Sequence, residues 1–127
     1  EEALSFDGNT GPYAQYTYAR TCSILAKEGE TRLAPVSSLC REERELIKTL
    51  SLFPEKVLTA IADYEPSVIT RYILDICNDF NRFYQACPIN SAPDADTKAF
   101  RRALTKCTGE VLARALELIC MKHPEKI

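Results

Sequence analysis

Apolar residues recur along this chain at the three- and four-residue spacing of helices, in five separate segments. The clearest segment runs from Pro66 to about Cys87. Its apolar residues share one helical face: Ile69, Tyr72, Ile73, Ile76, Cys77, Phe80, Phe83, Tyr84 and Cys87. The other segments cover residues 13–28, 41–52, about 54–62 and 95–121, and no strand alternation of useful length is present. The pattern predicts an all-α fold, a bundle of about five helices in one domain.

Turn-forming residues separate the predicted helices. Residues 1–11 lack sustained periodicity and predict a linker, after which Pro12 suits the first turn of a helix. Residues 30–40 form a connector, in which Ser37 or Ser38 could cap the next helix. The stretch 88–94 contains two prolines and predicts a loop.

The last helix has a less regular apolar face. The residues expected to point inward are Phe100, Leu104, Cys107, Val111, Ala115 and Leu118. Gly109 lies inside this helix, where glycine costs about 1 kcal/mol relative to alanine. Its presence predicts that a neighbouring element packs closely at that point.

Charge and cysteine content restrict the protein class. The formal net charge is −2, so the basic excess of a freestanding nucleic-acid binder is absent. No stretch approaches the roughly 20 consecutive apolar residues that a membrane-spanning helix needs, and no signal peptide is visible at the start of the chain. Six cysteines fall mostly at positions that a small apolar residue would fill, without a C-x-x-C pair. We expect reduced, buried thiols in a cytoplasmic protein, with disulfides or a metal site as alternatives.

The chain lacks recognisable catalytic equipment. Its single histidine, His123, lies beyond the last apolar face and has no partners nearby in sequence for acid–base, zinc or triad chemistry. A solvated histidine in the tail is the interpretation we favour. Four glycines are present, and none forms a phosphate-binding loop. We therefore predict that the chain itself has no catalytic residues, metal or cofactor.

Two helical faces carry residues suited to RNA. On the first helix, Tyr13, Tyr16, Thr17, Arg20 and Ile24 share one face, and aromatic rings beside an arginine suit unstacked bases. On the last helix, Lys98, Arg101 and Arg102 form a basic stripe with Lys106 at its edge, which could follow a phosphate backbone. Buried tyrosines with tethered hydroxyls and an ordinary solvated face are the alternatives, and the residue pattern leaves both open.

Four stretches of the sequence are similar to arginyl-tRNA synthetases. The segment Leu4–Arg20, with its Gly-Asn-Thr-Gly-Pro-Tyr run, resembles the join between the catalytic domain and the C-terminal helical domain of that family. Residues 80–88, Phe-Asn-Arg-Phe-Tyr-Gln-Ala-Cys-Pro, resemble a Phe-Asn-x-Phe-Tyr stretch of the same domain. The stretch 101–104 and the Pro-Glu-Lys ending complete the likeness. The resemblance implies an all-α anticodon-binding domain, named for its Asp-Ala-Leu-Arg signature, over residues 1–127.

The resemblance also implies roles for individual residues. By that likeness Tyr16 and Arg20 lie near the anticodon loop, Tyr84 contacts loop bases, and the chain end at Ile127 approaches the anticodon. Tyr13, Arg101 and Arg102 complete the set of expected tRNA contacts. The family usually ends in methionine, so Ile127 implies a changed contact.

The implied function is recognition of the anticodon stem-loop of an arginine tRNA. The whole enzyme of the family joins arginine to that tRNA, and its ATP and arginine sites lie in a catalytic domain that this sequence lacks. The expected partners are the tRNA and that catalytic domain, with a monomeric state and no membrane contact. The alternative is a helical protein-interaction module that keeps the fold without RNA binding.

Overall fold

The computed structural model describes residues 11–127 and places five α-helices in them, which confirms the all-α prediction. The helices are α1 (Gly11–Ala26), α2 (Arg41–Ser51), α3 (Phe53–Asp63), α4 (Ser67–Ala86) and α5 (Ala95–Leu118). The predicted linker over residues 1–11 lies outside the described residues, apart from Gly11, which begins α1. No helix in residues 11–127 is long and apolar enough to cross a membrane.

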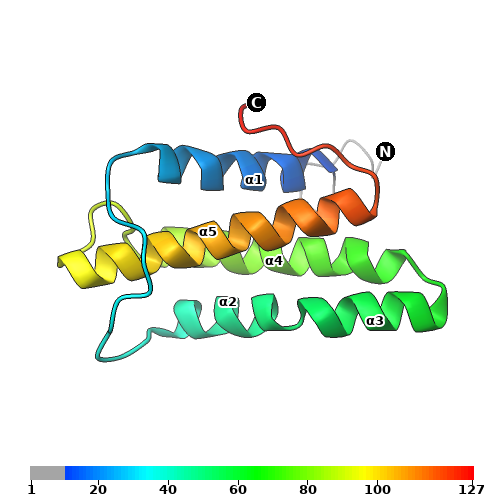
Figure 1. Ribbon diagram of the computed structural model, residues 1–127, viewed down its shortest axis with the longest axis horizontal. Coiled ribbons are helices and arrows are strands. Elements are labelled where there is room, and N and C mark those ends of the chain that lie inside the picture. Colours follow the sequence, from blue (N-terminus) through cyan, green and yellow to red (C-terminus); the bar gives the residue numbers. More distant parts are fainter. Residues whose placement is uncertain (1–10) are drawn as a thin grey trace.

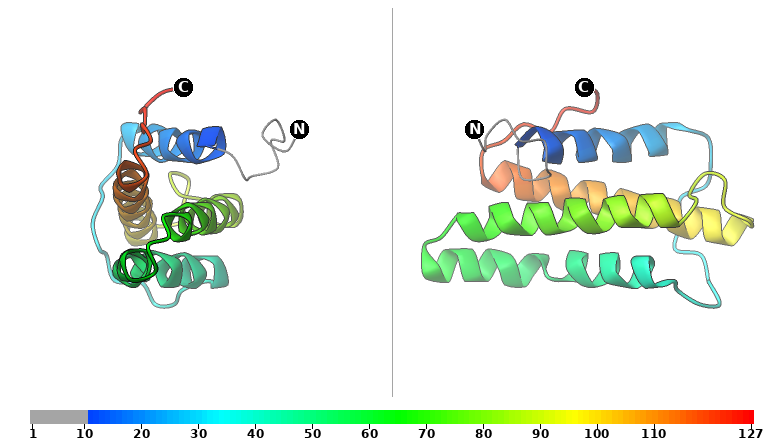
Figure 2. Two further views of the ribbon diagram at one scale, coloured as in Figure 1. Left: turned by 90° about the vertical axis from the view of Figure 1, so that its right-hand side faces the viewer. Right: turned by 180° about the vertical axis from the view of Figure 1, so that it is seen from behind.

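The helices form three layers (Figure 1). Helix α1 lies on one side, α4 and α5 form the middle, and α2 and α3 follow each other along the other side. The views in Figure 2 show the same order from the end and from behind, and the C-terminal tail runs back along α1. The division between α2 and α3 falls at Leu52, and Pro54 in the first turn of α3 accounts for it, because proline has no N–H to continue the preceding helix.

Helix α4 contributes more buried apolar residues than any other helix. Seven residues of its predicted apolar face are at most 4% exposed: Ile69, Tyr72, Ile73, Ile76, Cys77, Phe80 and Phe83. The first half of α4 packs with Leu112 and Leu116 of α5, and the second half packs with Leu46 of α2. One long amphipathic helix thus joins the two sides of the bundle.

The predicted inward face of α5 is confirmed only in part: Leu104 and Ala115 are buried, and Phe100 and Val111 are partly buried against the core. Cys107 and Leu118 are exposed, whereas α5 buries Arg102, Thr105, Thr108, Gly109, Leu112 and Leu116. The prediction missed these residues because the contact with α1 is made by small and polar residues. At Gly109 an added Cβ would lie 2.9 Å from the hydroxyl oxygen of Thr21, which confirms the predicted close packing.

Several local predictions need correction. Cys40, and not Ser37 or Ser38, is the N-cap of α2, and its N–H donates to the Glu43 carboxylate at 3.2 Å. His123 is half-buried: its Nε2 lies 3.0 Å from a Glu117 oxygen, and its ring meets Tyr18 edge-on at 5.0 Å. The histidine therefore ties the tail to α5 and is not a freely solvated residue.

Candidate nucleic-acid interface

Arg20 lies between two aromatic side chains from different helices. Its guanidinium carbon is 5.1 Å from the ring centre of Tyr16 and 4.7 Å from that of Tyr84, within the range of cation–π attraction. Tyr16 is one helical turn before Arg20 on α1, whereas Tyr84 comes from the last turn of α4. The close packing of α1 on α4 is what brings Tyr84 to the pair.

A hydrogen-bond network fixes the direction of Arg20. Its Nη1 donates to Asn81 Oδ1 at 2.7 Å. The amide nitrogen of Asn81 donates to the Tyr13 hydroxyl at 2.9 Å and to Thr17 Oγ1 at 3.3 Å. The Tyr13 hydroxyl in turn donates to Asn78 at 3.1 Å. Side chains that are held in place in the free protein lose less entropy when a ligand binds.

The two tyrosine rings remain accessible to a ligand. Tyr16 is 53% exposed and Tyr84 is 42% exposed. Tyr84 also stacks on the buried ring of Phe80, with ring centres 6.4 Å apart, so the core supports one side of it. A supported aromatic ring with an open surface is a suitable platform for a stacked base.

The C-terminal tail completes a surface groove at this place. Gln15 donates to the Lys122 carbonyl at 2.9 Å and so holds the tail against α1. A groove of about 490 Å³ is lined by Tyr16, Ala19, Arg20, Ser23, Tyr84, Lys126 and Ile127. A second groove, of about 600 Å³, continues past Tyr13 and shares three residues with the first: Tyr16, Lys126 and Ile127. We call these two adjoining hollows the tyrosine groove.

Five of the seven predicted contact residues thus gather at the tyrosine groove: Tyr13, Tyr16, Arg20, Tyr84 and Ile127. Whether each one touches RNA stays a prediction. Asn81 and Lys126 also belong to this site and are not among the predicted contact residues, although both lie in the stretches that carry the family resemblance.

Arg102 does not belong to an exposed basic stripe, so that prediction is wrong. The residue is 2% exposed, and its guanidinium donates to the carbonyls of Ile24 and Leu25 at the end of α1. It also donates to Asn90 at 2.7 Å and to Thr31 at 3.2 Å. A positive group among the last carbonyls of a helix satisfies oxygens that have no partner within the helix.

Arg101 is also engaged within the protein. Its Nη1 donates to the Pro88 carbonyl at 2.8 Å, and its Nη2 lies 3.6 Å from a Glu43 oxygen. Its side chain is 14% exposed. Arg101 and Arg102 both support the loop between α4 and α5, away from the tyrosine groove.

The fold and the groove together define a helical domain with the features of a single-stranded RNA binder: exposed aromatic faces around an oriented arginine. A family model described as "DALR anticodon binding domain" matches residues 14–127. The chain therefore belongs to the DALR anticodon-binding domain family.

Individual relatives agree with this assignment. Over 121 residues the chain is 46% identical to an arginine–tRNA ligase of Clostridium botulinum, a match that covers 94% of the chain and 22% of the relative. It is 43% identical to an arginine–tRNA ligase of Clostridium kluyveri over 131 residues, covering 99% of the chain and 23% of the relative. The solved arginyl-tRNA synthetase of Thermus thermophilus matches with a TM-score of 0.90 and 37% identity, over 99% of the chain and 22% of that structure. The chain thus spans about a fifth of the length of these relatives.

Proposed function

We propose that this chain is the anticodon-binding part of an arginine–tRNA ligase and that the tyrosine groove receives bases of the anticodon loop. The observation that carries the proposal is Arg20 held between Tyr16 and Tyr84, two exposed rings on neighbouring helices. Unpaired loop bases can stack on such rings, while a guanidinium binds a phosphate or a base edge. Lys126, at the rim of the groove, adds a second positive charge.

The net charge of −2 fits an RNA-binding surface of which this chain supplies only one part. Phosphate contacts supply much of the affinity of most nucleic-acid binders, and they require a local positive charge. Arg101 and Arg102 do not provide it, because both guanidinium groups are bound within the protein. We infer that the remainder of the parent enzyme carries most phosphate contacts, together with the ATP and arginine sites, and that the enzyme works in the cytoplasm.

Binding of an arginine tRNA anticodon stem-loop to the 127-residue chain tests this proposal. Tyr84→Ala removes a stacking platform, which is worth about 1–3 kcal/mol per base, and should weaken binding by about 5- to 150-fold. Tyr84→Phe keeps the ring and should bind nearly as the parent chain does. Tyr64→Ala is the matched control, because Tyr64 is 92% exposed at the end of α3, outside the groove. Substituting the central anticodon base should also weaken binding.

The proposal fails if Tyr84→Ala binds as tightly as Tyr64→Ala, or if the chain does not discriminate the substituted loop. In the full-length parent, Tyr84→Ala should raise KM for the tRNA and leave KM for ATP and arginine unchanged. A rise in KM for all three substrates would indicate damage to the catalytic part instead.

A second surface favours contact with protein. Helix α3 has no fully buried residue, and its outer side carries exposed apolar side chains: Leu58 (67%), Ile61 (65%) and Tyr64 (92%). A groove of about 460 Å³ runs between α3 and the end of α5 and is lined by Val57, Ile61, Tyr64, Leu118 and Ile119, among others. We propose that the catalytic part of the same parent protein covers this surface, since contiguous exposed apolar surface marks interaction sites.

A further inference from the structure

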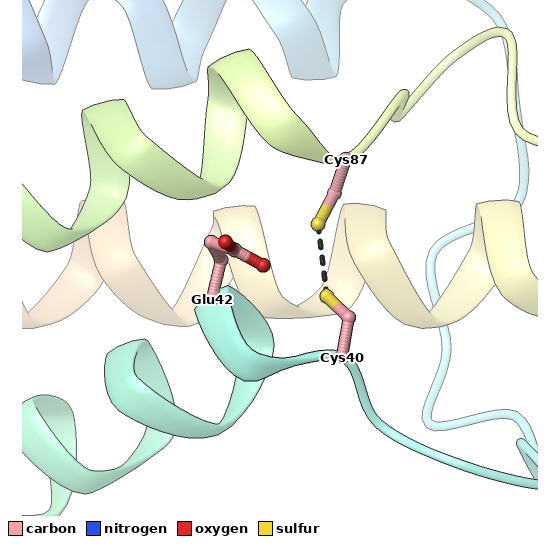
Figure 3. A group of neighbouring side chains, drawn as sticks. All are labelled: Cys40, Glu42 and Cys87. Carbon is pink, nitrogen blue, oxygen red and sulfur yellow. Dashed lines mark hydrogen bonds between the residues drawn. The ribbon is translucent and has the colours of Figure 1, made fainter.

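The sulfur atoms of Cys40 and Cys87 lie 3.0 Å apart, although the two residues are 47 positions apart in the chain. Cys40 stands directly before α2 and Cys87 directly after α4, and their side chains point toward each other (Figure 3). Both cysteines are free thiols, joined only by a hydrogen bond. Neither cysteine lines the tyrosine groove.

We propose that Cys40 and Cys87 form a reversible oxidation site, which a hydroperoxide converts to an intramolecular disulfide. The assignment rests on the contact between the two sulfurs, on their unequal access to solvent and on the charges around them. It does not depend on the proposed RNA binding.

Access to solvent gives the two thiols different roles. Cys40 is half-buried whereas Cys87 is 3% exposed, so Cys40 is the more accessible of the two to an oxidant. Burial raises the pKa of Cys87 to about 12, and the hydrogen bond to Cys40 acts in the same direction. Cys87 therefore keeps its proton while its sulfur stays in contact with that of Cys40. This arrangement makes Cys40 the nucleophile and Cys87 the thiol that resolves the product.

The reaction balances with the hydroperoxide as the only co-reactant. The Cys40 sulfur, after losing its proton, attacks the terminal peroxide oxygen: an S–O bond forms, the O–O bond breaks, and the departing alkoxide takes up the proton as an alcohol. The Cys87 sulfur then attacks the sulfenic sulfur of Cys40. The S–S bond forms, the S–O bond breaks, and hydroxide leaves with the Cys87 proton as water. The two thiols lose two electrons, and the peroxide gains them.

The local charges favour this chemistry over a bound cation. The N-terminus of α2 lies at Cys40, and the positive end of a helix attracts anions and repels cations. The Arg101 guanidinium lies close by, 3.6 Å from Glu43, whose carboxylate accepts the Cys40 N–H. Among the described residues only Glu42 joins the two sulfurs as a possible ligand, whereas structural zinc sites take four.

The geometry allows the bond to form. The sulfurs must approach by about 1 Å to reach a disulfide length of about 2.05 Å. Residues 27–40 contain no helix, so the backbone of Cys40 is joined to a helix on one side only. The bond would close a loop that contains α2, α3 and α4, which restricts the unfolded chain. We expect the thermal midpoint to rise by roughly 5–15 °C on oxidation.

The test treats the reduced 127-residue chain with hydrogen peroxide and measures its intact mass under denaturing, non-reducing conditions. The expected result is a loss of about 2 Da, a linked peptide pair that contains Cys40 and Cys87, and full recovery with a reductant. Cys87→Ser should instead leave a Cys40 sulfenic acid that dimedone traps. Cys120→Ser, a change at an exposed cysteine, should oxidise as the parent chain does.

Three results would overturn the assignment. Oxygen atoms could add to Cys40 without any linked peptide, or the linked peptides could join other cysteines or two chains. Stoichiometric zinc that survives desalting, and that both Cys40→Ser and Cys87→Ser abolish, would identify a metal site instead. The mass measurement on the unaltered chain decides the question even if a serine variant fails to fold.

Discussion

The guanidinium of Arg102 ends among backbone oxygens, whereas that of Arg20 ends among aromatic rings at the surface. Arg102 is 2% exposed and donates hydrogen bonds to four residues that are distant in the chain or lie across a loop: Ile24, Leu25, Thr31 and Asn90. Arg20 is only partly buried and lines the tyrosine groove. The same side chain therefore stabilises the fold at one place and is available to a ligand at the other.

Replacing each arginine by methionine should separate these roles. Arg102→Met leaves the carbonyls of Ile24 and Leu25 and the Asn90 amide without their donor. It should lower the free energy of unfolding by about 2–4 kcal/mol. Arg20→Met should lower it by less than about 1 kcal/mol while weakening stem-loop binding. Urea denaturation measures both variants, and equal losses for the two would refute the distinction.

Asp94 begins α5 as its N-cap and gives stability a defined pH dependence. Its carboxylate accepts from the Thr97 N–H and hydroxyl, both at 2.8 Å, and these bonds hold its pKa below the ordinary value of 3.8. A carboxyl group with a lowered pKa stabilises the fold above its unfolded pKa, and the contribution disappears as pH falls through the folded value. Asp94→Ala should therefore lower the thermal midpoint at pH 7, and the difference from the parent should shrink below about pH 3.8.

The matched control for that cap is Asp75→Ala, at an exposed carboxylate in the middle of α4. Its difference from the parent at pH 7 should be small, because this side chain caps no helix. An Asp94→Ala difference that stays constant down to pH 2.5 would contradict the capping role.

At the scale of elements, α1 and α5 pack through small and polar residues. The hydroxyl of Thr21 donates to the Tyr18 carbonyl at 2.6 Å and occupies the space above Gly109. Thr105 and Thr108 likewise donate to carbonyls four residues earlier in α5, so their methyl groups can face the interface. Close approach of the helix backbones, rather than a stripe of large apolar side chains, holds α1 in place.

A double-mutant cycle tests the contact at Gly109. Gly109→Ala gains about 1 kcal/mol of helix propensity but places a Cβ 2.9 Å from Thr21 Oγ1, and we expect a net loss of about 1–2 kcal/mol. In a Thr21→Ala background the same change should be neutral or stabilising, because the hydroxyl is gone. Denaturant unfolding of the four proteins gives the coupling energy, and a value near zero would exclude the proposed contact.

Periodicity predicted the five helices because each buries at least part of one side, and α4 shows this most clearly. On α5 it identified Leu104 and Ala115, but it missed the buried threonines, Gly109 and Arg102 and placed the exposed Cys107 and Leu118 inside. Hydrophobicity alone cannot identify a buried arginine that binds helix-end carbonyls. Helical geometry predicted that Tyr13, Tyr16 and Arg20 share a face. The addition of Tyr84 and the tail depended on tertiary packing, which only the family resemblance indicated.

At the scale of the whole molecule, two surfaces on different elements remain available to partners. The tyrosine groove combines aromatic rings with Arg20 and Lys126, whereas the α3 surface is apolar. The chain spans about a fifth of the length of its relatives, so each surface can contact a different part of a larger assembly. An RNA loop suits the first surface, and protein suits the second.

The α3 surface should matter only in the full-length parent. Ile61→Lys alters a side chain that is 65% exposed and should change the free energy of unfolding of the 127-residue chain by less than about 0.5 kcal/mol. In the parent it should lower the thermal midpoint or expose the junction to protease, whereas Thr59→Lys, an exposed change on the same helix, should not. Equal behaviour of the two variants in the parent would remove the proposed contact.

NMR tests most directly whether the tyrosine groove receives the anticodon loop. The isotope-labelled 127-residue chain is titrated with the arginine tRNA anticodon stem-loop, and its backbone amide and arginine Nε signals are followed. The largest backbone amide shifts should fall on α1 around Tyr16 and Arg20, on the last turn of α4 and on residues 125–127. The Arg20 Nε signal should move and the Arg102 Nε signal should stay in place. Shifts concentrated on α3 and Leu118, or on Arg101 and Arg102, would contradict binding at the tyrosine groove.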